Sequence, residues 1–525
     1  MAAPVRPAIT MNRLFTDNMV LQHGMALPVW GTAAAGEKIT VKLNGQTKTA
    51  TAGATGAWKL KLDSLAIGGP FQMVIQGSDT LTGAGNITLG NVMVGEVWLC
   101  SGQSNMTISL NNFYNPNIEA AGLNNVRLFS EKSDIVGVGP WNECTPATAA
   151  KFPATAFFVG KILSDSLKIP IGIIVGAVGA TMIEEWLSTQ SILDDPDLDT
   201  AQVFTDGSDG GFPGGNKGGG LYRAVIAPLI PFAIRGMFWY QGEWNTSANK
   251  HPEKYQNRFT ELLKGWRTEW DQGDFPIYFV QLPNFKSRDD WATIREAQRL
   301  NLKSVANTGM AIAVDLGGGV PGFPDSTELH PRDKKDVGYR LVLPALAHTY
   351  GHKILAASGP LFKSLSIRND TAHLSFEYIG SGLTAKNGSL GGFEIAVAND
   401  TNYVAAYASI AGSEVLVYKP GSNITRVRYA WASNPTATLY NKEGLPASPF
   451  QTYSTDVTGL AGKGIAAGHE AGEKQTLNSV KSFDLAGHSV TNRTGNKLSQ
   501  SIFHFTAKTL STDTWGTNFP VRKLK

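Results

Sequence analysis

Short runs of alternating apolar and polar residues fill the first part of the chain and predict β-strands. Gly, Asn and Asp cluster between these runs, which read LPVWGTA, EKITVKLNG, AWKLKL and PFQMVIQG. Closely spaced short strands separated by turn residues are typical of a sheet with one buried face. We therefore predict a small N-terminal β-sandwich over residues 12–90.

The pattern changes over residues 91–355, where longer apolar runs alternate with stretches of helical periodicity, such as 154–166 and 252–268. Alternating strands and helices imply a parallel sheet that helices cover on both faces. This segment is therefore predicted to be a three-layer α/β/α domain. The predicted strands are 92–100, 171–178, 233–240, 276–282 and 309–316.

Short strand patterns return over residues 356–455, including HLSFEYIG, GFEIAVAND and EVLVYKP, and predict a second β region. Residues 456–525 are rich in Gly, Ser, Thr, Asn and Lys. They match no recognisable pattern, and we treat them as a tail.

One strand of the central segment ends in an abrupt polar turn. The apolar run Val92–Cys100 passes directly into the polar residues Ser101–Asn105. Chemistry in open α/β sheets occurs where strands end. Ser104 would then stand at the mouth of a following helix, whose amides and dipole would favour an anion. An ordinary polar turn explains the same pattern.

His330 lies in a second polar loop, DSTELHP, after the apolar run AIAVDLGG and before a predicted helix. An acid close to a histidine beyond a strand end is the arrangement of an acyl-transfer triad. A polar surface loop is the alternative. His348 and His352 are spaced like a metal pair, but no third ligand is evident, and a helix surface explains them better.

Composition excludes several classes of function. Among 525 residues the formal net charge is +3, and no basic cluster appears before the last few residues, which argues against nucleic-acid and anionic-membrane partners. No apolar run reaches the length of a membrane span, and the N-terminus lacks a signal-peptide core. The two cysteines, Cys100 and Cys144, form no disulfide framework, and we expect free thiols.

The block GEVWLCSGQSNM at 95–106 resembles the nucleophile block of the sialate O-acetylesterase family, which are SGNH-type carbohydrate hydrolases. FWYQGEWN at 238–245 and LHPRDKKDVGYRL at 329–341 resemble two more blocks of that family. The resemblance extends over roughly residues 14–455. It implies an SGNH-type three-layer α/β/α hydrolase domain flanked by jelly-roll-like β-sandwich regions.

The resemblance implies that Ser104 is the nucleophile and His330 the general base. The family pattern Asp-x-His-Pro is replaced by Glu328-Leu329-His330-Pro331, so Glu328 matches the acid. Asp325 and Asp315 are fallback acids. A backbone carbonyl that orients the imidazole is a further alternative.

The resemblance also implies an oxyanion hole made by the N–H groups of Ser104 and Gly179 and the side-chain amide of Asn245. The family shows Gly-Gly-Thr where this chain has Gly179-Ala180-Thr181. A phosphate cradle is excluded for this loop, because the spacing of its glycines fits neither nucleotide-binding motif. Gln241 and Glu243 are expected to hold the neighbouring loop together. No metal or organic cofactor is implied.

The implied substrate is an acetylated carbohydrate. We favour acetylated xylan or related polymers, with 9-O-acetylated sialic acid as the alternative. The family implies a secreted or periplasmic protein, and the oligomeric state stays open. Two other interpretations are a carbohydrate-binding protein with a decayed hydrolase core and a lipase. Intact Ser104, His330 and Asn245 argue against the former. The missing Gly-x-Ser-x-Gly elbow argues against the latter.

Overall fold

The structure is a computed structural model. It describes residues 8–78, 86–130, 140–196, 198, 219–317, 328–397, 402–453 and 456, together with two short strands in the tail. The chain divides into two compact units, residues 1–461 and 462–525. In the second unit β25 (Ser482–Phe483) pairs antiparallel with β26 (Ser489–Val490). All sites discussed below lie in the first unit.

The predicted N-terminal strands are confirmed. β1, β3 and β6 form a three-stranded antiparallel sheet, and β4 pairs with β5 and β7. Buried and exposed residues alternate along β4 and β6, as expected for strands with one face on a core. The strands are β1 (Thr10–Met11), β2 (Val20–Gln22), β3 (Leu27–Thr32), β4 (Lys38–Leu43), β5 (Gln46–Thr51), β6 (Ala57–Leu62) and β7 (Gly68–Gly77).

A single long strand, β8 (Asn86–Gly102), belongs to both the N-terminal region and the central sheet. Its first part pairs antiparallel with β7, and residues 93–95 pair in parallel with β2. Its last part lies in parallel between β11 (Ile171–Ala177) and β12 (Gly236–Tyr240). Burial along β8 is partial before residue 94 and complete after it. The boundary proposed at residues 90/91 therefore falls inside one continuous strand.

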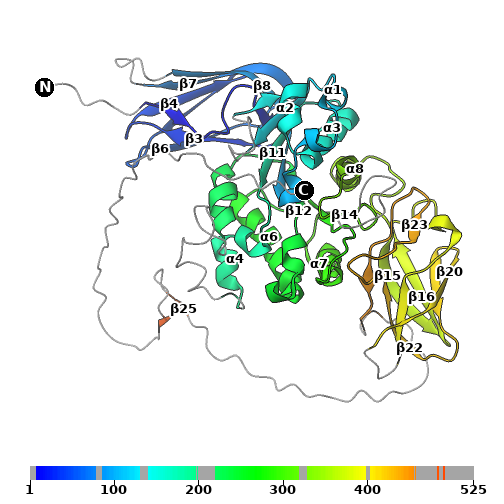
Figure 1. The fold of residues 1–525 in the computed structure, drawn as a ribbon. Helices are drawn as coiled ribbons and strands as arrows, with labels where there is room; N and C mark the ends of the chain where they lie inside the picture. The colour runs from blue at the N-terminus through cyan, green and yellow to red at the C-terminus, as the bar shows by residue number, and fades with distance from the viewer. Residues whose placement is uncertain are drawn as a thin grey trace, which may run out of the picture. The chain divides into compact units, whose positions relative to one another are not determined.

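The central sheet follows the order β10-β9-β11-β8-β12-β13-β14 (Figure 1). All neighbours on this path are parallel except β10, and the antiparallel N-terminal strands make the complete sheet mixed. The predicted strands are confirmed, although several are shorter than their apolar runs. The remaining strands are β9 (Val126–Ser130), β10 (Asn142–Glu143), β13 (Ile277–Gln281) and β14 (Thr308–Ile312).

Helices pack in pairs beside this sheet. α3 contacts α8, and α6 contacts α7 (Figure 1). The predicted helix 154–166 is confirmed as α3, and the one predicted over 252–268 begins at residue 255 after a short 3-10 turn. The α-helices are α1 (Pro116–Glu119), α2 (Pro146–Lys151), α3 (Ala154–Leu167), α4 (Thr189–Asp194), α6 (Tyr255–Trp270), α7 (Trp291–Ser304) and α8 (Lys334–Pro344).

The second β region contains two four-stranded antiparallel sheets, β15-β16-β21-β20 and β19-β18-β22-β24, and the pair β17-β23 (Figure 1). Side chains from both sheets meet in one buried apolar cluster. The strands are β15 (Leu361–Arg368), β16 (Thr371–Glu377), β17 (Leu383–Ala385), β18 (Phe393–Val397), β19 (Val404–Ala405), β20 (Tyr407–Ala411), β21 (Glu414–Tyr418), β22 (Ile424–Tyr429), β23 (Leu439–Asn441) and β24 (Phe450–Gln451).

Two further expectations concern the cysteines and membrane-spanning helices. Cys100 and Cys144 are buried free thiols, as predicted. Among the described residues, no helix combines the length and apolarity needed to cross a membrane.

Candidate active site

Ser104 lies at the carboxyl end of β8 because the chain turns sharply there. A Cβ atom on Gly102 would stand 2.1 Å from the carbonyl oxygen of Tyr240, and Gly102 has a φ of +133°. Only glycine fits both conditions. The Gln103 N–H then donates to the Tyr240 carbonyl at 2.9 Å. The close approach of β12 thus fixes the start of the serine turn.

The helix expected after Ser104 is only a three-residue 3-10 turn, Ser104–Met106. The prediction that a helix dipole supports an anion at Ser104 was therefore wrong. So short a turn aligns too few peptide groups to produce a useful macrodipole. Any oxyanion at this position depends on individual hydrogen-bond donors.

His330 meets Ser104 directly, although the two residues are 226 positions apart. Its Nε2 lies 2.9 Å from Ser104 Oγ. The pKa of His330 is lowered by burial and by the positive charge of Lys334, and Glu328 opposes this shift. Neutral imidazole is therefore the dominant form at pH 7, and this form can accept a proton from serine.

Glu328 lies beside His330 without a side-chain hydrogen bond to it. Its Oε1 accepts the His330 backbone N–H at 3.3 Å and stands 3.9 Å from Nδ1. That second distance is too long for a hydrogen bond. The fallback acid Asp315 is bound by Arg340 and accepts a hydrogen bond from the Tyr440 hydroxyl at 3.1 Å. Asp325 lies outside the described residues.

Gly179 lies against the serine. A Cβ atom built on Gly179 would stand 3.4 Å from Ser104 Cβ. The Val178 N–H donates to the Gly102 carbonyl at 3.0 Å and ties the two loops together. Within the described part of the chain, the N–H groups of Ser104 and Gly179 donate to no protein acceptor. Ala180 follows with a φ of +57°, a conformation that favours glycine.

Asn245 is held rigidly in the 3-10 turn Glu243–Thr246. Its Oδ1 accepts hydrogen bonds from the Ile183 N–H at 3.0 Å and from Gln241 Nε2 at 2.8 Å. Its Nδ2 donates to Glu184 at 3.0 Å. Nδ2 also lies 3.5 Å from the other oxygen of the same carboxylate, and an amide nitrogen carries two hydrogens.

Several supporting residues escaped the sequence analysis. Glu184, which receives the Asn245 amide, is paired with Arg258, and both are largely buried. Lys334 is fully buried beside Asn105. Their charges are visible in the sequence, but nothing there separates a buried charge from an exposed one. Gln241 and Glu243 do hold the loop together, as predicted, through hydrogen bonds to Thr181, Tyr255 and Asn105.

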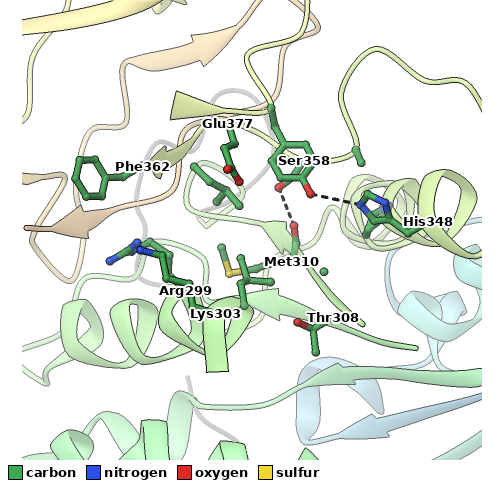
Figure 2. A pocket seen from close by; sticks show the side chains of 14 residues that line it. Arg299, Lys303, Thr308, Met310, His348, Ser358, Phe362 and Glu377 are labelled. Atoms are coloured by element: carbon green, nitrogen blue, oxygen red, sulfur yellow. Dashed lines mark hydrogen bonds between the residues drawn. The ribbon is translucent and has the colours of Figure 1, made fainter. Parts of the chain in front are cut away.

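A cavity of about 160 Å³ lies elsewhere, beside the amino-terminal end of β14 and the second β region (Figure 2). His348 Nε2 lies 3.4 Å from the Tyr378 hydroxyl, and Ser358 Oγ donates to the Met310 carbonyl at 2.9 Å. Ser358 is therefore not paired with His348. Among the described residues, no group of three or more His, Cys, Asp or Glu side chains could hold a metal ion. Within the described ranges, the serine of this cavity therefore has no histidine base beside it.

Known proteins resemble this chain over most of its length. The model of the family described as "carbohydrate esterase, sialic acid-specific acetylesterase" matches residues 94–341. The sialate O-acetylesterase of Homo sapiens is 31% identical over 495 residues, covering 84% of this chain and 92% of that protein. The Rattus norvegicus sialate O-acetylesterase is 30% identical over 514 residues, covering 83% and 93%.

A crystal structure of a carbohydrate acetylesterase from Xanthomonas citri superimposes with a TM-score of 0.75 and 34% identity. The match covers 85% of this chain and all of that one. The matched family segment contains Ser104, Gly179, Asn245 and His330. The chain therefore belongs to the sialic acid-specific acetylesterase family of carbohydrate esterases, and it is an esterase.

Proposed function

We propose that this esterase removes O-acetyl groups from carbohydrates through an acetyl-enzyme on Ser104. The observation that carries the proposal is the 2.9 Å contact between Ser104 Oγ and His330 Nε2. A serine hydroxyl is a weak nucleophile until an adjacent base accepts its proton. The lowered pKa of His330, caused first by burial, keeps that base neutral at pH 7.

In the first step His330 Nε2 accepts the hydroxyl proton while Ser104 Oγ bonds to the acetyl carbonyl carbon. The carbonyl oxygen becomes an oxyanion. Its donors are the N–H groups of Ser104 and Gly179 and the second Nδ2 hydrogen of Asn245. Loss of one such donor typically lowers kcat by about 10²–10³-fold.

In the second step His330 returns the proton to the departing sugar oxygen, and the acetyl group stays on Ser104. Water, deprotonated by His330, then attacks the acetyl-enzyme; His330 returns that proton to Ser104 Oγ as the Ser104–acetyl bond breaks, and acetate leaves. Glu328 orients the loop through the His330 backbone N–H, and its charge stabilises the imidazolium that forms. No step requires a metal or an organic cofactor.

Three observations support a neutral sugar such as acetylated xylan. Two buried cations near the site, Lys334 and Arg258, already bind Asn105 and Glu184. An anionic sugar would meet the carboxylate of Glu328, which is 40% exposed. Trp244, next to Asn245, is 48% exposed and offers an aromatic face to a sugar ring. The names of the relatives, sialate O-acetylesterases, instead favour an O-acetylated sialate as substrate.

Finer features of the fold are part of the same proposal. An SGNH-type three-layer hydrolase domain is supported by the parallel strand order and by the position of Ser104 after a strand end. β-Sandwich packing of the second β region is supported by the core shared between its two sheets. Secretion or a periplasmic location is supported by the family resemblance.

The test measures acetate release from acetylated xylan and from 9-O-acetylated sialic acid in parallel, with Ser104→Ala as control. Release from xylan alone supports the neutral-sugar assignment, and release from sialate alone replaces it. Release from both substrates indicates that the site selects the acetyl group rather than the sugar. Equal acetate release by the folded Ser104→Ala variant would refute the acetyl-enzyme mechanism.

A further inference from the structure

A single asparagine, Asn105, stands between a buried cation and a buried anion. Lys334 Nζ donates a short hydrogen bond to Asn105 Oδ1. Asn105 Nδ2 donates to Glu243 Oε1 at 2.6 Å. The exposed fractions of Lys334, Asn105 and Glu243 are 0%, 1% and 6%. Charged groups are almost never buried this deeply unless they are paired, so this arrangement calls for an explanation.

The three residues come from three of the loops that form the site. Asn105 directly follows Ser104, and Lys334 begins α8 four residues after His330. Glu243 begins the 3-10 turn that contains Asn245. Each of these three loops therefore sends one side chain into the same buried chain of hydrogen bonds.

Two more contacts fix Asn105 itself. Thr155 Oγ1 donates to the Asn105 carbonyl at 2.9 Å and joins it to α3. Asn105 Nδ2 also lies 3.4 Å from the carbonyl of Leu329, the residue before His330. Main-chain and side-chain atoms of Asn105 are thus both engaged, and the serine next to it has little freedom to move.

The order of charges requires an amide at position 105. The carbonyl end of Asn105 faces the ammonium group, and its NH₂ end faces the carboxylate. An aspartate would place a second negative charge against Glu243, and an apolar residue would leave both charges without partners. Asn105 therefore serves as a neutral spacer that satisfies opposite charges at its two ends.

We propose that Lys334, Asn105 and Glu243 form a buried clamp that holds Ser104, His330 and Asn245 in reacting geometry, with Lys334 as its central positioning residue. The inference rests on the proposed roles of Ser104 and His330. Misplacement of reacting groups by about 1 Å can lower turnover about 100-fold. The clamp acts through geometry and charge and touches no substrate atom.

The clamp also affects the charge on the base. Burial lowers the pKa of Lys334 to about 7, opposed by Glu243 and Glu328. Burial raises the pKa of Glu243, opposed by the hydrogen bond from Asn105 and by the charge of Lys334. The Tyr240 ring is 5.7 Å from Lys334 Nζ. Among the described residues, Lys334 and Glu328 are the charges that act on His330, with opposite signs.

Removing Lys334 therefore has two separable effects. The loops lose their common anchor, so turnover falls. The cation that lowers the pKa of His330 is also lost, so that pKa rises. Because neutral His330 is the reactive form, the acid limb of kcat/KM against pH then moves to higher pH. A residue that only supports packing would lower turnover without moving this limb.

The test uses the full chain with p-nitrophenyl acetate, and compares Lys334→Met, Glu243→Gln and the double variant. Lys335→Met is the matched control, since Lys335 is the next residue and its side chain is 55% exposed. Folding of each variant is checked by circular dichroism. Ser104→Ala reports separately on the proposed mechanism, so failure of the mechanism and failure of the clamp are distinguishable.

We expect Lys334→Met to lower kcat/KM about 100-fold and to move the acid limb to higher pH. The double variant should recover at least about tenfold, because it no longer buries an unpaired carboxylate, and its acid limb should stay displaced. If Lys334→Met does not fold, the proposal is tested by whether the acid limb of kcat/KM for the double variant lies at higher pH than that of the wild type. An unshifted limb, or a double variant as impaired as folded Lys334→Met, would overturn the proposal.

Discussion

Glu328→Gln tests how an acid can assist His330 without a hydrogen bond to Nδ1. Glu328 Oε1 and His330 Nδ1 are 3.9 Å apart, and the two side chains are 40% and 32% exposed. Because both side chains are partly exposed, water screens their interaction almost as strongly as it would in bulk solvent. At 3.9 Å two unit charges in water attract by about 1 kcal/mol.

That energy applies when His330 becomes cationic during proton transfer, so its loss raises the barrier. About 1 kcal/mol corresponds to a roughly fivefold lower kcat. The pH dependence has a definite sign. Glu328 raises the pKa of His330, so its neutralisation lowers that pKa and moves the acid limb to lower pH. This shift is opposite to the one expected for Lys334→Met.

The assay measures kcat and kcat/KM for p-nitrophenyl acetate across pH with purified Glu328→Gln. The isosteric amide keeps an oxygen for the His330 backbone N–H, so the loop should retain its shape. A loss of about 100-fold or more would mean that Glu328 closes onto Nδ1 in the working enzyme. An unchanged kcat would move the acid role to Asp325 or to a backbone carbonyl.

Four further outcomes are expected. Ala180→Gly should stabilise the protein by about 1 kcal/mol in urea unfolding, because a φ of +57° strains alanine, and an unchanged midpoint would contradict this. His330→Ala should reduce acetate release nearly to background with folding intact, and normal activity would remove His330 from the mechanism. Because burial and Lys334 lower the pKa of His330, kcat/KM should be half-maximal below pH 6.5, and a midpoint above that value would reverse the sign of this argument. A chain ending at Ala461 should keep wild-type kcat/KM, and a folded but inactive truncation would assign the tail a role in catalysis.

The strands of the central sheet were predictable because burial on both faces produces continuous apolar runs. β8, β11 and β12 follow this rule, and the end of each apolar run predicted where the next polar turn begins. Ser104 and His330 were identified from their motifs, and the structure brings them into contact. Contact between residues so far apart in sequence depends on strand order, which a local pattern does not encode.

Other features left no signal in the sequence. Lys334 and Lys335 are neighbours in one charged run, yet one is fully buried and the other exposed. Which of the two side chains is buried depends on the direction in which α8 begins. The boundary near residue 90 was also invisible, because apolar residues continue through β8 without a break. The length of the turn after Ser104 was mispredicted, since a strand end does not determine how far a helix propagates.

The continuity of β8 connects the N-terminal region directly to Ser104, the proposed nucleophile. A strand advances about 3.3 Å per residue, and a shift of one residue exchanges its two faces. A slip of one position between β7 and β8 would therefore exchange the faces of β8 against β7, while β11 and β12 hold its last part in register. An exchange of N-terminal regions between relatives must preserve this pairing register, and a cut at residue 90 would divide the strand that leads to Ser104.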